Sequence, residues 1–509
     1  MARDLPEGWR RVHLVGIGGV AMSGLARLLV ARGAVVSGSD AVESRQLAQL
    51  RALGVPVTVG RDPAGFDPGG LAGVDLVVVA PAVPAEDPEL AEARRRELRI
   101  LTRSAALAGL MQGHRGVAVA GSHGKTTAAM MLTAALQACG EDPTFAVGGD
   151  PGEAGSQTHA GSSDLMIVEA DEDGGAFWQL QPHGAVLTGV ADEHLDFYRT
   201  VPALRASFAT FLHRVEPDGF LVACVDDEAA WSLATEAARH AARATEAARA
   251  TEATEATGAG LGAGTGGAGR SGGRGPWLTG YGFGPSADLR IVAAEVSTAG
   301  TSAEIIAHGV RLGRMSLRVP GRHHLLDAAA ALATGLALGA PADGLLAGLA
   351  SFAGVRRRFE PLGSAAGVRV VDDYANHPDR VTAAISTARA LASGGRVVVA
   401  FQPHLYSRTA LLAERLGEAL RSADSVVVMD VYGAAQAPEP GAGGARVALA
   451  ARGGQAEVGY EPSWSAVPGQ LMDRARPGDV VLTLGAGDVT QIGPELLRLL
   501  TARAASHRG

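Results

Sequence analysis

The chain has 509 residues, a formal net charge of −8, and a composition that is 47% hydrophobic but only 4% aromatic. This length suggests about three domains, and the acidic balance argues against a nucleic-acid-binding protein, which usually carries a basic domain or stripe. The two cysteines, Cys139 and Cys224, are too few for a disulfide framework, so we expect a reduced, cytoplasmic protein. Residues 1–10 contain no signal-peptide core and no apolar run is long enough to span a bilayer, so we expect no membrane association.

The first part of the chain alternates strands with helices, which predicts a Rossmann-like domain at residues 1–113. One strand is followed by the glycine-rich turn Gly16–Gly24, a helix to about Ala31, and a second strand that ends at Asp40. The glycines let a diphosphate approach the backbone, but such a loop fits an NAD-binding domain as well as a UDP-binding one. We expect strands at 11–15, 34–40, 74–80 and 99–102, and helical structure over much of 86–112.

The central part, residues 114–352, continues the alternation but is interrupted by a low-complexity segment at about 234–275. An Ala/Thr/Glu repeat forms the first half of that segment, and a glycine-rich tract forms the second. We predict a surface insertion without catalytic residues, with a solvated helix permitted in the first half and no regular structure in the second. We expect strands at 116–120, 165–169, 185–189, 220–225, 288–295 and 302–307, and a helix at 325–338.

The last part, residues 353–509, shows a third alternation, with strands expected at 368–372, 396–401, 425–429 and 479–483. Alternating strands and helices favour a parallel or mostly parallel sheet in each domain. The fold class predicted is therefore α/β with three domains. They are a Rossmann-like N-terminal domain, a P-loop ATPase-like central domain with a mostly parallel sheet, and a Rossmann-like C-terminal domain.

The sequence GSHGKTT, Gly121–Thr127, lies directly between a predicted strand and a predicted helix. This is the context that a phosphate-binding loop requires, because its backbone N–H groups and the helix N-terminus face the phosphates. Lys125 is the only lysine in the chain, whereas 44 residues are arginine. A lysine ammonium is a compact point charge and an arginine is a wide fork, so a site that keeps lysine favours the smaller group. We predict that Lys125 reaches the β- and γ-phosphates of a nucleotide and that Thr126 binds Mg²⁺.

Further motifs, in chain order, resemble blocks of the Mur ligase family, and they cover nearly the whole chain outside the low-complexity segment. GSHGKTT resembles the ATP loop of that family, and GIGGVAMSG (16–24) resembles the uridine-nucleotide loop of its alanine-adding members. The other blocks are DPTFAVGGD (142–150), VEADE (168–172), DEHLD (192–196), PGRHH (320–324), VRRRFE (355–360), DDYANHP (372–378), FQPHLYSRT (401–409) and GAGDVT (485–490).

The resemblance implies an ATP-dependent ligase of peptidoglycan precursor synthesis that uses ATP and Mg²⁺, with Mn²⁺ as the alternative cation. A carboxylate attacks the γ-phosphate of ATP, and an amine then attacks the resulting acyl phosphate, which gives an amide, ADP and phosphate. The implied substrates are UDP-N-acetylmuramate, through its lactyl carboxylate, and L-alanine. The implied protein is a cytoplasmic monomer or homodimer that binds neither nucleic acid nor membrane.

The residues and the resemblance together single out three binding sites and a metal site. Residues expected to act in catalysis are Lys125, His123, Glu169, His194 and Arg408. Residues expected to bind ATP are Gly121, Ser122, His123, Gly124, Lys125, Thr126, Thr127, Arg322, His323, Arg358 and Asp373. Residues expected to bind the UDP-sugar are Gly16, Gly18, Gly19, Ser39, Asp40 and Arg103. Residues expected to bind the amino acid are Tyr374, His377, His404 and Arg408. Residues expected to bind the metal are Thr126, Glu169 and His194.

Some positions depart from the family pattern, notably Gly189, His324, Asp327 and Asn376. Two alternatives follow from these departures: a diverged ligase that adds another amino acid or a peptide, and a nucleotide-binding protein that has lost turnover. An NAD-dependent oxidoreductase is a third alternative, but it would leave the ATP loop and the last domain without a role.

Overall fold

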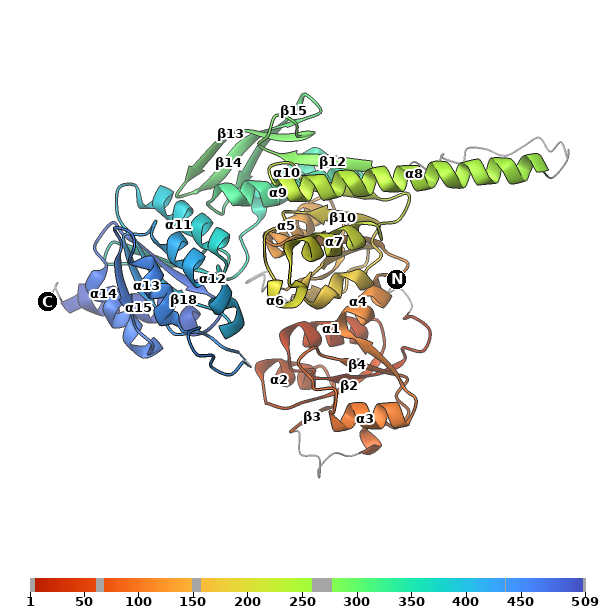
Figure 1. Cartoon of the computed structure of the whole chain (residues 1–509), viewed down its shortest axis with the longest axis horizontal. Coiled ribbons are helices and arrows are strands. Elements are labelled where there is room, and N and C mark those ends of the chain that lie inside the picture. Colours follow the sequence, from red (N-terminus) through yellow and green to blue (C-terminus); the bar gives the residue numbers. More distant parts are fainter. Residues whose placement is uncertain (1–4, 61–67, 149–156, 259–276, 435, 507–509) are drawn as a thin grey trace.

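The computed structural model describes residues 5–60, 68–148, 157–258, 277–434 and 436–506. Three sheets follow one another along the chain, one in each of three lobes (Figure 1). The predicted three-domain α/β fold class is confirmed. We propose domain limits at 113/114 and 352/353, which fall between α4 (Arg103–Met111) and β6 (Arg115–Ala120), and between α10 (Ala342–Ser351) and β16 (Glu360–Ala365).

The N-terminal lobe is a parallel sheet of five strands in the order β3-β2-β1-β4-β5, with β1 in the middle. Apolar runs such as VHLV in β1 are buried because helices cover both faces of the sheet. Strand order reverses beside β1, so the loop after β1 opens at the edge where this fold binds nucleotides. The elements are β1 (Arg11–Val15), α1 (Val20–Ala31), β2 (Val35–Asp40), α2 (Arg45–Ala52), β3 (Val57–Val59), β4 (Leu76–Val79), α3 (Pro88–Arg95), β5 (Arg99–Thr102) and α4.

The central lobe contains a sheet of ten strands in the order β15-β14-β13-β12-β11-β10-β6-β9-β7-β8. Its middle is parallel. At one end β13 pairs parallel with β12 and begins an extension in which β14 is antiparallel to both β13 and β15. The parallel strands are β6, β7 (Thr144–Ala146), β9 (Leu165–Glu169), β10 (Gly184–Leu187), β11 (Phe220–Cys224) and β12 (Trp277–Gly282). The others are β8 (Thr158–His159), β13 (Leu289–Ser297), β14 (Gly300–Ala307) and β15 (Val310–Leu317), and the helices are α5 (Lys125–Ala138), α6 (Leu195–Tyr198), α7 (Val201–Leu212), α8 (Glu228–Gly258), α9 (Arg322–Ala337) and α10.

The C-terminal lobe has six strands in the order β16-β17-β21-β18-β19-β20, all parallel except the edge strand β16. Its strands after β16 are β17 (Val368–Asp373), β18 (Val397–Gln402), β19 (Ser425–Val428), β20 (Glu457–Tyr460) and β21 (Val480–Gly485). Its helices are α11 (Pro378–Ala392), α12 (Tyr406–Leu420), α13 (Gly444–Ala451), α14 (Val467–Arg474) and α15 (Ile492–Ser506).

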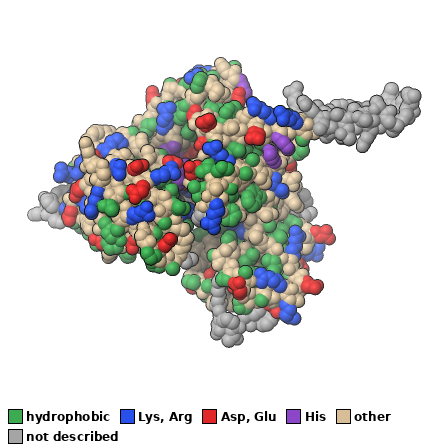
Figure 2. All heavy atoms as spheres, in the orientation of Figure 1, with side chains coloured by type: hydrophobic (Ala, Val, Ile, Leu, Met, Phe, Trp, Pro, Cys, Tyr) green, Lys and Arg blue, Asp and Glu red, His purple; other side chains and the backbone are tan. Residues whose placement is uncertain are grey.

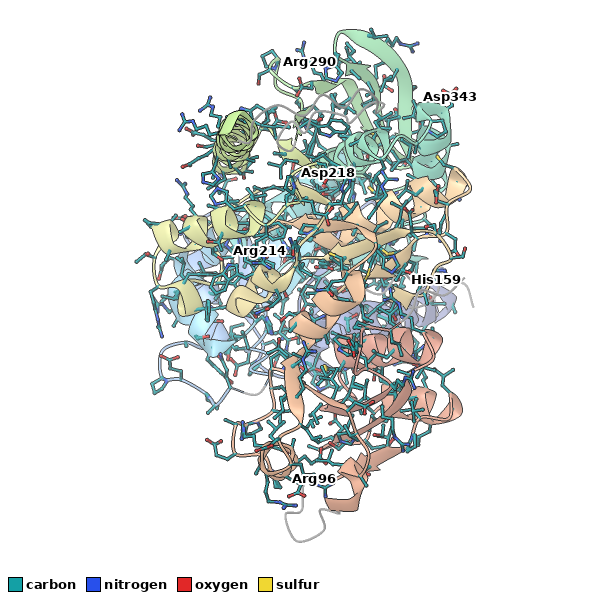
Figure 3. All side chains as sticks on the ribbon, turned by 90° about the vertical axis from the view of Figure 1, so that its right-hand side faces the viewer. Arg96, His159, Arg214, Asp218, Arg290 and Asp343 are labelled. Carbon is teal, nitrogen blue, oxygen red and sulfur yellow. The ribbon has the colours of Figure 1, made fainter. Side chains whose placement is uncertain are left out.

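The lobes differ in how they are joined. One hydrophobic core runs from Leu14 in the N-terminal sheet through Leu110 to Phe208 in the central lobe, so these two lobes share buried apolar surface. The view from the side opposite the C-terminal lobe shows them stacked, with Arg96 near one end and Arg290 near the other (Figure 3). The C-terminal lobe has its own core and meets the central lobe along α11 and α12 (Figure 1). Charges of both signs are interspersed over the face drawn in Figure 2. No helix in the described ranges is both long and apolar enough to cross a membrane.

The position of helix α8 contradicts part of the prediction that residues 234–275 form a surface insertion. The helix begins before the low-complexity segment and extends away from the body of the protein (Figure 1). Its first turns are part of the core, since Ala234 and Ala237 are 1% and 3% exposed. Alanine is short enough to pack closely against α7, which the composition of the repeat did not reveal. The glycine-rich half of the predicted insertion, 259–275, lies outside the described residues.

We expect Ala234→Asp to destabilise the central lobe by about 2–4 kcal/mol, because an unpaired carboxylate would be placed in a closed apolar core. Ser232→Asp on the same helix is the matched control, since Ser232 is exposed and its replacement should change stability by about 0.5 kcal/mol or less. Urea unfolding followed by circular dichroism compares the two. Equal effects would mean that α8 is solvated from its start.

Candidate active site

The phosphate loop connects β6 to α5 in the middle of the central sheet, and two of its glycines have positive φ angles. Gly121 has φ +128° and Gly124 has φ +78°, which lies in the left-handed region that side chains rarely adopt. A Cβ at Gly124 would lie 2.2 Å from Oδ1 of Asp327. The loop therefore places its backbone N–H groups at the N-terminus of the 14-residue helix α5, which is a favourable position for an anion.

Lys125 is buried at the start of α5, and its Nζ donates to Oε2 of Glu172 at 2.8 Å. Burial alone would lower the pKa of Lys125, but the charges of Glu172, Asp171 and Glu169 raise it above the usual value. The lysine is thus held in its charged form. Glu172 is fully buried, and we had not predicted it as a site residue. Its position three residues after Glu169 in VEADE is the signal that could have identified it.

Two groups of potential cation ligands lie beside Lys125. The hydroxyl of Thr126 donates to Oε2 of Glu169 at 2.9 Å, so these two predicted metal ligands are in contact. His194, the third predicted ligand, groups instead with Asp171 and Glu172, with one ligand atom from each within 4.8 Å of the others. Oε1 of Glu172 is buried without a hydrogen-bond partner in the described structure. Carboxylate oxygens and a hydroxyl are the ligands that Mg²⁺ prefers.

A cavity of about 330 Å³ lies above the phosphate loop, between the central and C-terminal lobes. Asp327 and Arg358 line it, and burial lowers the pKa of the Arg358 guanidinium. Arg322, which we expected near the nucleotide, is instead exposed and stacks on the ring of Phe283 at 3.7 Å. The predicted ATP residues that line the cavity are His123, Gly124, Lys125, Thr126, Thr127, His323, Arg358 and Asp373. Gly121 and Ser122 precede this stretch in the same loop.

A second cavity, of about 140 Å³, lies between the N-terminal and central lobes. Arg103 lines it, together with Val20 at the start of α1 and Glu169. Glu169 therefore borders both this cavity and the one above the phosphate loop.

The other predicted UDP-sugar residues form the loop after β1 and the end of β2. Oδ2 of Asp40 accepts the N–H of Gly18 at 2.8 Å, and the N–H of Gly16 donates to the carbonyl of Ser39 at 2.8 Å. Asp40 thus holds the loop shape. Gly16, Gly18 and Gly19 directly precede α1, whose Val20 and Ala21 line the second cavity, whereas Ser39 and Asp40 end the neighbouring strand β2.

A third cavity, of about 210 Å³, is lined by Arg408 and His377 together with His194 and Asn376. Nη2 of Arg408 lies 3.1 Å from Nδ1 of His194, and Nε of Arg408 is buried without a hydrogen-bond partner in the described structure. Burial opposes protonation of His194, but Asp173 and Glu172 more than compensate and raise its pKa.

The remaining two predicted amino-acid residues, His404 and Tyr374, are not among the residues that line this third cavity. Nδ1 of His404 is 3.3 Å from Nδ2 of Asn376, and burial lowers the pKa of His404 to about 4. Tyr374 lies beside Arg357 and Arg358, whose guanidinium carbons are 5.0 Å and 5.3 Å from its ring centre. Tyr374 therefore packs against two arginines of the segment between α10 and β16, and it does not line this cavity.

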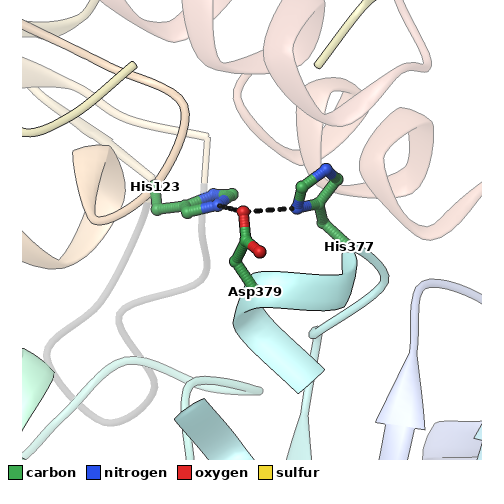
Figure 4. Close-up of side chains that lie close together, drawn as sticks. All are labelled: His123, His377 and Asp379. Atoms are coloured by element: carbon green, nitrogen blue, oxygen red, sulfur yellow. Dashed lines mark ion pairs between the residues drawn. The ribbon is translucent and has the colours of Figure 1, made fainter. Parts of the chain in front are cut away.

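The C-terminal lobe touches the phosphate loop directly. From α11, Nε of Arg380 donates to Nδ1 of His123 at 2.9 Å, and Nη2 of Arg380 donates to the carbonyl of Ser122 at 2.8 Å. His377 and Asp379 stand beside the His123 ring (Figure 4). We had not predicted a role for Arg380, since nothing in the sequence distinguishes it from the other arginines.

Three family models match the chain in the order of its lobes. The Mur ligase family catalytic domain matches residues 11–115, the Mur ligase middle domain matches 119–267, and the Mur ligase glutamate ligase domain matches 357–487. Together they cover more than half of the chain.

The chain belongs to the Mur ligase family. A UDP-N-acetylmuramate–L-alanine ligase of Acidothermus cellulolyticus is 47% identical over 494 residues, which is 97% of this chain and 95% of that protein. A protein of the same name from Mycobacterium tuberculosis is 46% identical over 510 residues, covering 98% and 97% of the two chains. The crystal structure of the Thermotoga maritima UDP-N-acetylmuramate-alanine ligase shares the fold, with a TM-score of 0.73 at 24% identity over 97% of this chain and 99% of that one.

Among the residues of this chain that depart from the Mur ligase pattern, Asp327 is chemically the most unusual. It is buried beside the phosphate loop, and burial raises its pKa to about 8, although Arg358 and Arg380 act in the opposite direction. His324, three residues earlier, has its pKa lowered by burial to about 3, and its Nδ1 donates to the carbonyl of Pro320 at 2.8 Å. Both side chains are therefore uncharged at neutral pH.

We expect Asp327→Asn to stabilise the protein at high pH. The carboxyl ionises near 3.8 in the unfolded chain but near 8 in the folded one, so between these values unfolding releases a proton and rising pH favours the unfolded state. Asparagine removes this dependence. The variant should gain about 2–4 kcal/mol more over the parent at pH 8 than at pH 5.

Urea unfolding at the two pH values measures the difference for Asp327→Asn. The matched control is Asp343→Asn, whose parent side chain is exposed at the start of α10 (Figure 3) and whose effect should be the same at both pH values. A pH-independent effect of Asp327→Asn would mean that this aspartate is ionised in the fold.

Proposed function

We propose that this protein catalyses the ATP-dependent ligation of L-alanine to the lactyl carboxylate of UDP-N-acetylmuramate, through an acyl phosphate, in peptidoglycan precursor synthesis. The observation that carries the proposal is the identity of 46–47% over nearly the full chain to ligases of that name. The nucleotide substrates support a cytoplasmic location. We propose that the enzyme acts as a monomer or a homodimer.

The reaction brings two anions together, and the cavity above the phosphate loop supports that step. Lys125 is fixed in its charged form and supplies a point charge for the β- and γ-phosphates. The loop N–H groups at the start of α5 add partial positive charge. Glu169 stands where this cavity meets the one that Arg103 lines, so the sugar carboxylate would approach the γ-phosphate there.

Thr126, Glu169, Asp171, Glu172 and His194 are the residues that would hold Mg²⁺, or Mn²⁺, in this enzyme. When bound there, the cation supplies charge that screens the carboxylate from the phosphates. Tyr198 donates to the backbone carbonyl of Glu172, and this bond helps to keep the acidic segment in place.

The third cavity suits the incoming amino acid. Arg408 is a natural partner for its carboxylate, because a guanidinium forms paired hydrogen bonds with a carboxylate and one of its N–H groups is unpaired. The α-amine must attack as the neutral form. The half-buried His404, whose low pKa keeps it uncharged, lies next to Asn376 of this cavity. Arg380 of α11 contacts the phosphate loop, and this docking would limit access of water to the acyl phosphate.

The proposed function is tested by measuring phosphate release from the purified protein with ATP, Mg²⁺ and UDP-N-acetylmuramate. L-alanine, glycine, L-serine and a peptide are supplied in turn as the amine. We expect release that requires both the UDP-sugar and L-alanine. Release with another amine alone would assign a different specificity. Nucleotide binding without release for every amine would identify a protein that has lost turnover.

We expect Arg408→Lys to raise KM for L-alanine by roughly 10- to 100-fold and to leave KM for ATP almost unchanged, because an ammonium cannot pair with both carboxylate oxygens. Arg415→Lys is the matched control, since Arg415 lines the same cavity but contacts Asp379 at 3.7 Å. Initial rates at varied L-alanine and varied ATP separate the two constants. A rise in KM for ATP alone would remove Arg408 from the amino-acid site.

A further inference from the structure

Arg380 makes the direct polar link from the C-terminal lobe to the phosphate loop. It lies on α11 and donates from Nε to Nδ1 of His123 and from Nη2 to the carbonyl of Ser122, at 2.9 Å and 2.8 Å. Two hydrogen bonds from one planar guanidinium fix both the loop backbone and the plane of the histidine ring. Arg380 also lines the cavity above the loop.

The hydrogen bond from Arg380 determines which nitrogen of His123 carries a hydrogen. A guanidinium has donors only, so Nδ1 of His123 must accept with its lone pair. A neutral ring then carries its single hydrogen on Nε2. Nε2 is buried and has no hydrogen-bond partner among the described residues. The carboxylate oxygen of Asp379 lies 3.8 Å away, which is too far for a hydrogen bond.

This tautomer also decides between two interpretations of the group in Figure 4. His123, His377 and Asp379 have ligand atoms close enough together for a metal ion. A metal would need the lone pair of His123 on Nε2, whereas the bond from Arg380 places a hydrogen there. The guanidinium would also stand beside the cation and repel it. Nε2–H of His123 therefore has no acceptor among the described residues, and His123 belongs to the residues that line the cavity above the phosphate loop.

We propose that Arg380 is a positioning residue that fixes His123 as a neutral ring with its hydrogen on Nε2, so that His123 donates a hydrogen bond to the transferred phosphoryl group. The inference rests on the proposed ligase function. The hydrogen stays on Nε2, and the bond strengthens as negative charge develops on the phosphoryl oxygens. Because Arg380 belongs to the C-terminal lobe, the donor is correctly set only when that lobe is docked on the loop.

A double-mutant cycle between Arg380 and His123 tests this positioning role. We expect Arg380→Gln to lower kcat by on the order of 10- to 100-fold with little change in KM for ATP. In the His123→Ala background, Arg380→Gln should cause a much smaller loss, because only the hydrogen bond to the Ser122 carbonyl remains to be broken. Arg380→Lys should restore part of kcat, since one ammonium can replace one of the two hydrogen bonds.

The matched control is Arg389→Gln on the same helix, where the parent side chain pairs with Asp424 inside the C-terminal lobe at 2.5 Å. Its kcat should equal that of the parent. An equal loss from Arg380→Gln with and without His123 would overturn the inference, as would a change confined to KM for ATP. If Arg380→Gln does not fold, the cycle is made with Arg380→Lys, and additive losses there overturn the inference in the same way.

A second measurement observes the ring itself. In protein with ¹⁵N-labelled histidine, the His123 nitrogens, assigned by their loss in His123→Ala, should show a protonated Nε2 and an unprotonated Nδ1 in the parent. A protonated Nδ1 would overturn the inference. The outcomes are distinct from failure of the proposed function: a parent enzyme without L-alanine-dependent phosphate release refutes the function, whereas an active parent with additive losses refutes only the role of Arg380.

Discussion

The buried pair between Lys125 and Glu172 is the interaction on which the rest of the site depends. Glu169 ends β9, and Asp171 and Glu172 follow it directly. Bringing three carboxylates together with little water is costly unless cations compensate them. Lys125 supplies the compensation and is itself buried, so neither partner is stable in this position alone. The phosphate loop and the acidic segment must therefore form together, at the carboxyl ends of the neighbouring strands β6 and β9.

The arrangement of lobes follows from this centre. The N-terminal lobe shares a hydrophobic core with the central lobe, so the cavity that reaches Glu169 from below is built into a single packed unit. The C-terminal lobe keeps a separate core and contacts the centre through polar groups such as Arg380 and Arg408. Polar interfaces between lobes reform more easily than apolar cores after separation. Substrates can thus enter between lobes without the disruption of a core.

Local sequence signals predicted much of the fold and part of the site. The alternation of apolar strands with helices located most of the strands, and strand–loop–helix context located the phosphate loop, because both depend on neighbours in the chain. The roles proposed for the site residues stay predictions. Arg380, Glu172 and the burial of Ala234 depend on contacts between residues far apart in sequence, or on packing that composition does not encode. His194 illustrates the limit: its segment was identified, but its grouping with Asp171 and Glu172 required the fold.

Because Lys125 is the only lysine, the enzyme has little to lose by acylation from its own acyl phosphate intermediate. An acyl phosphate is an acylating agent, and a neutral lysine amine would attack it and terminate the enzyme's activity. Lys125 lines the cavity in which the proposed acyl phosphate forms, yet Glu172, Asp171 and Glu169 raise its pKa and keep the amine protonated, without a lone pair to attack. Every other basic side chain besides histidine is an arginine, whose guanidinium stays protonated and is a poor nucleophile. The chain therefore has no neutral lysine amine that could compete with the substrate's amine for the acyl phosphate.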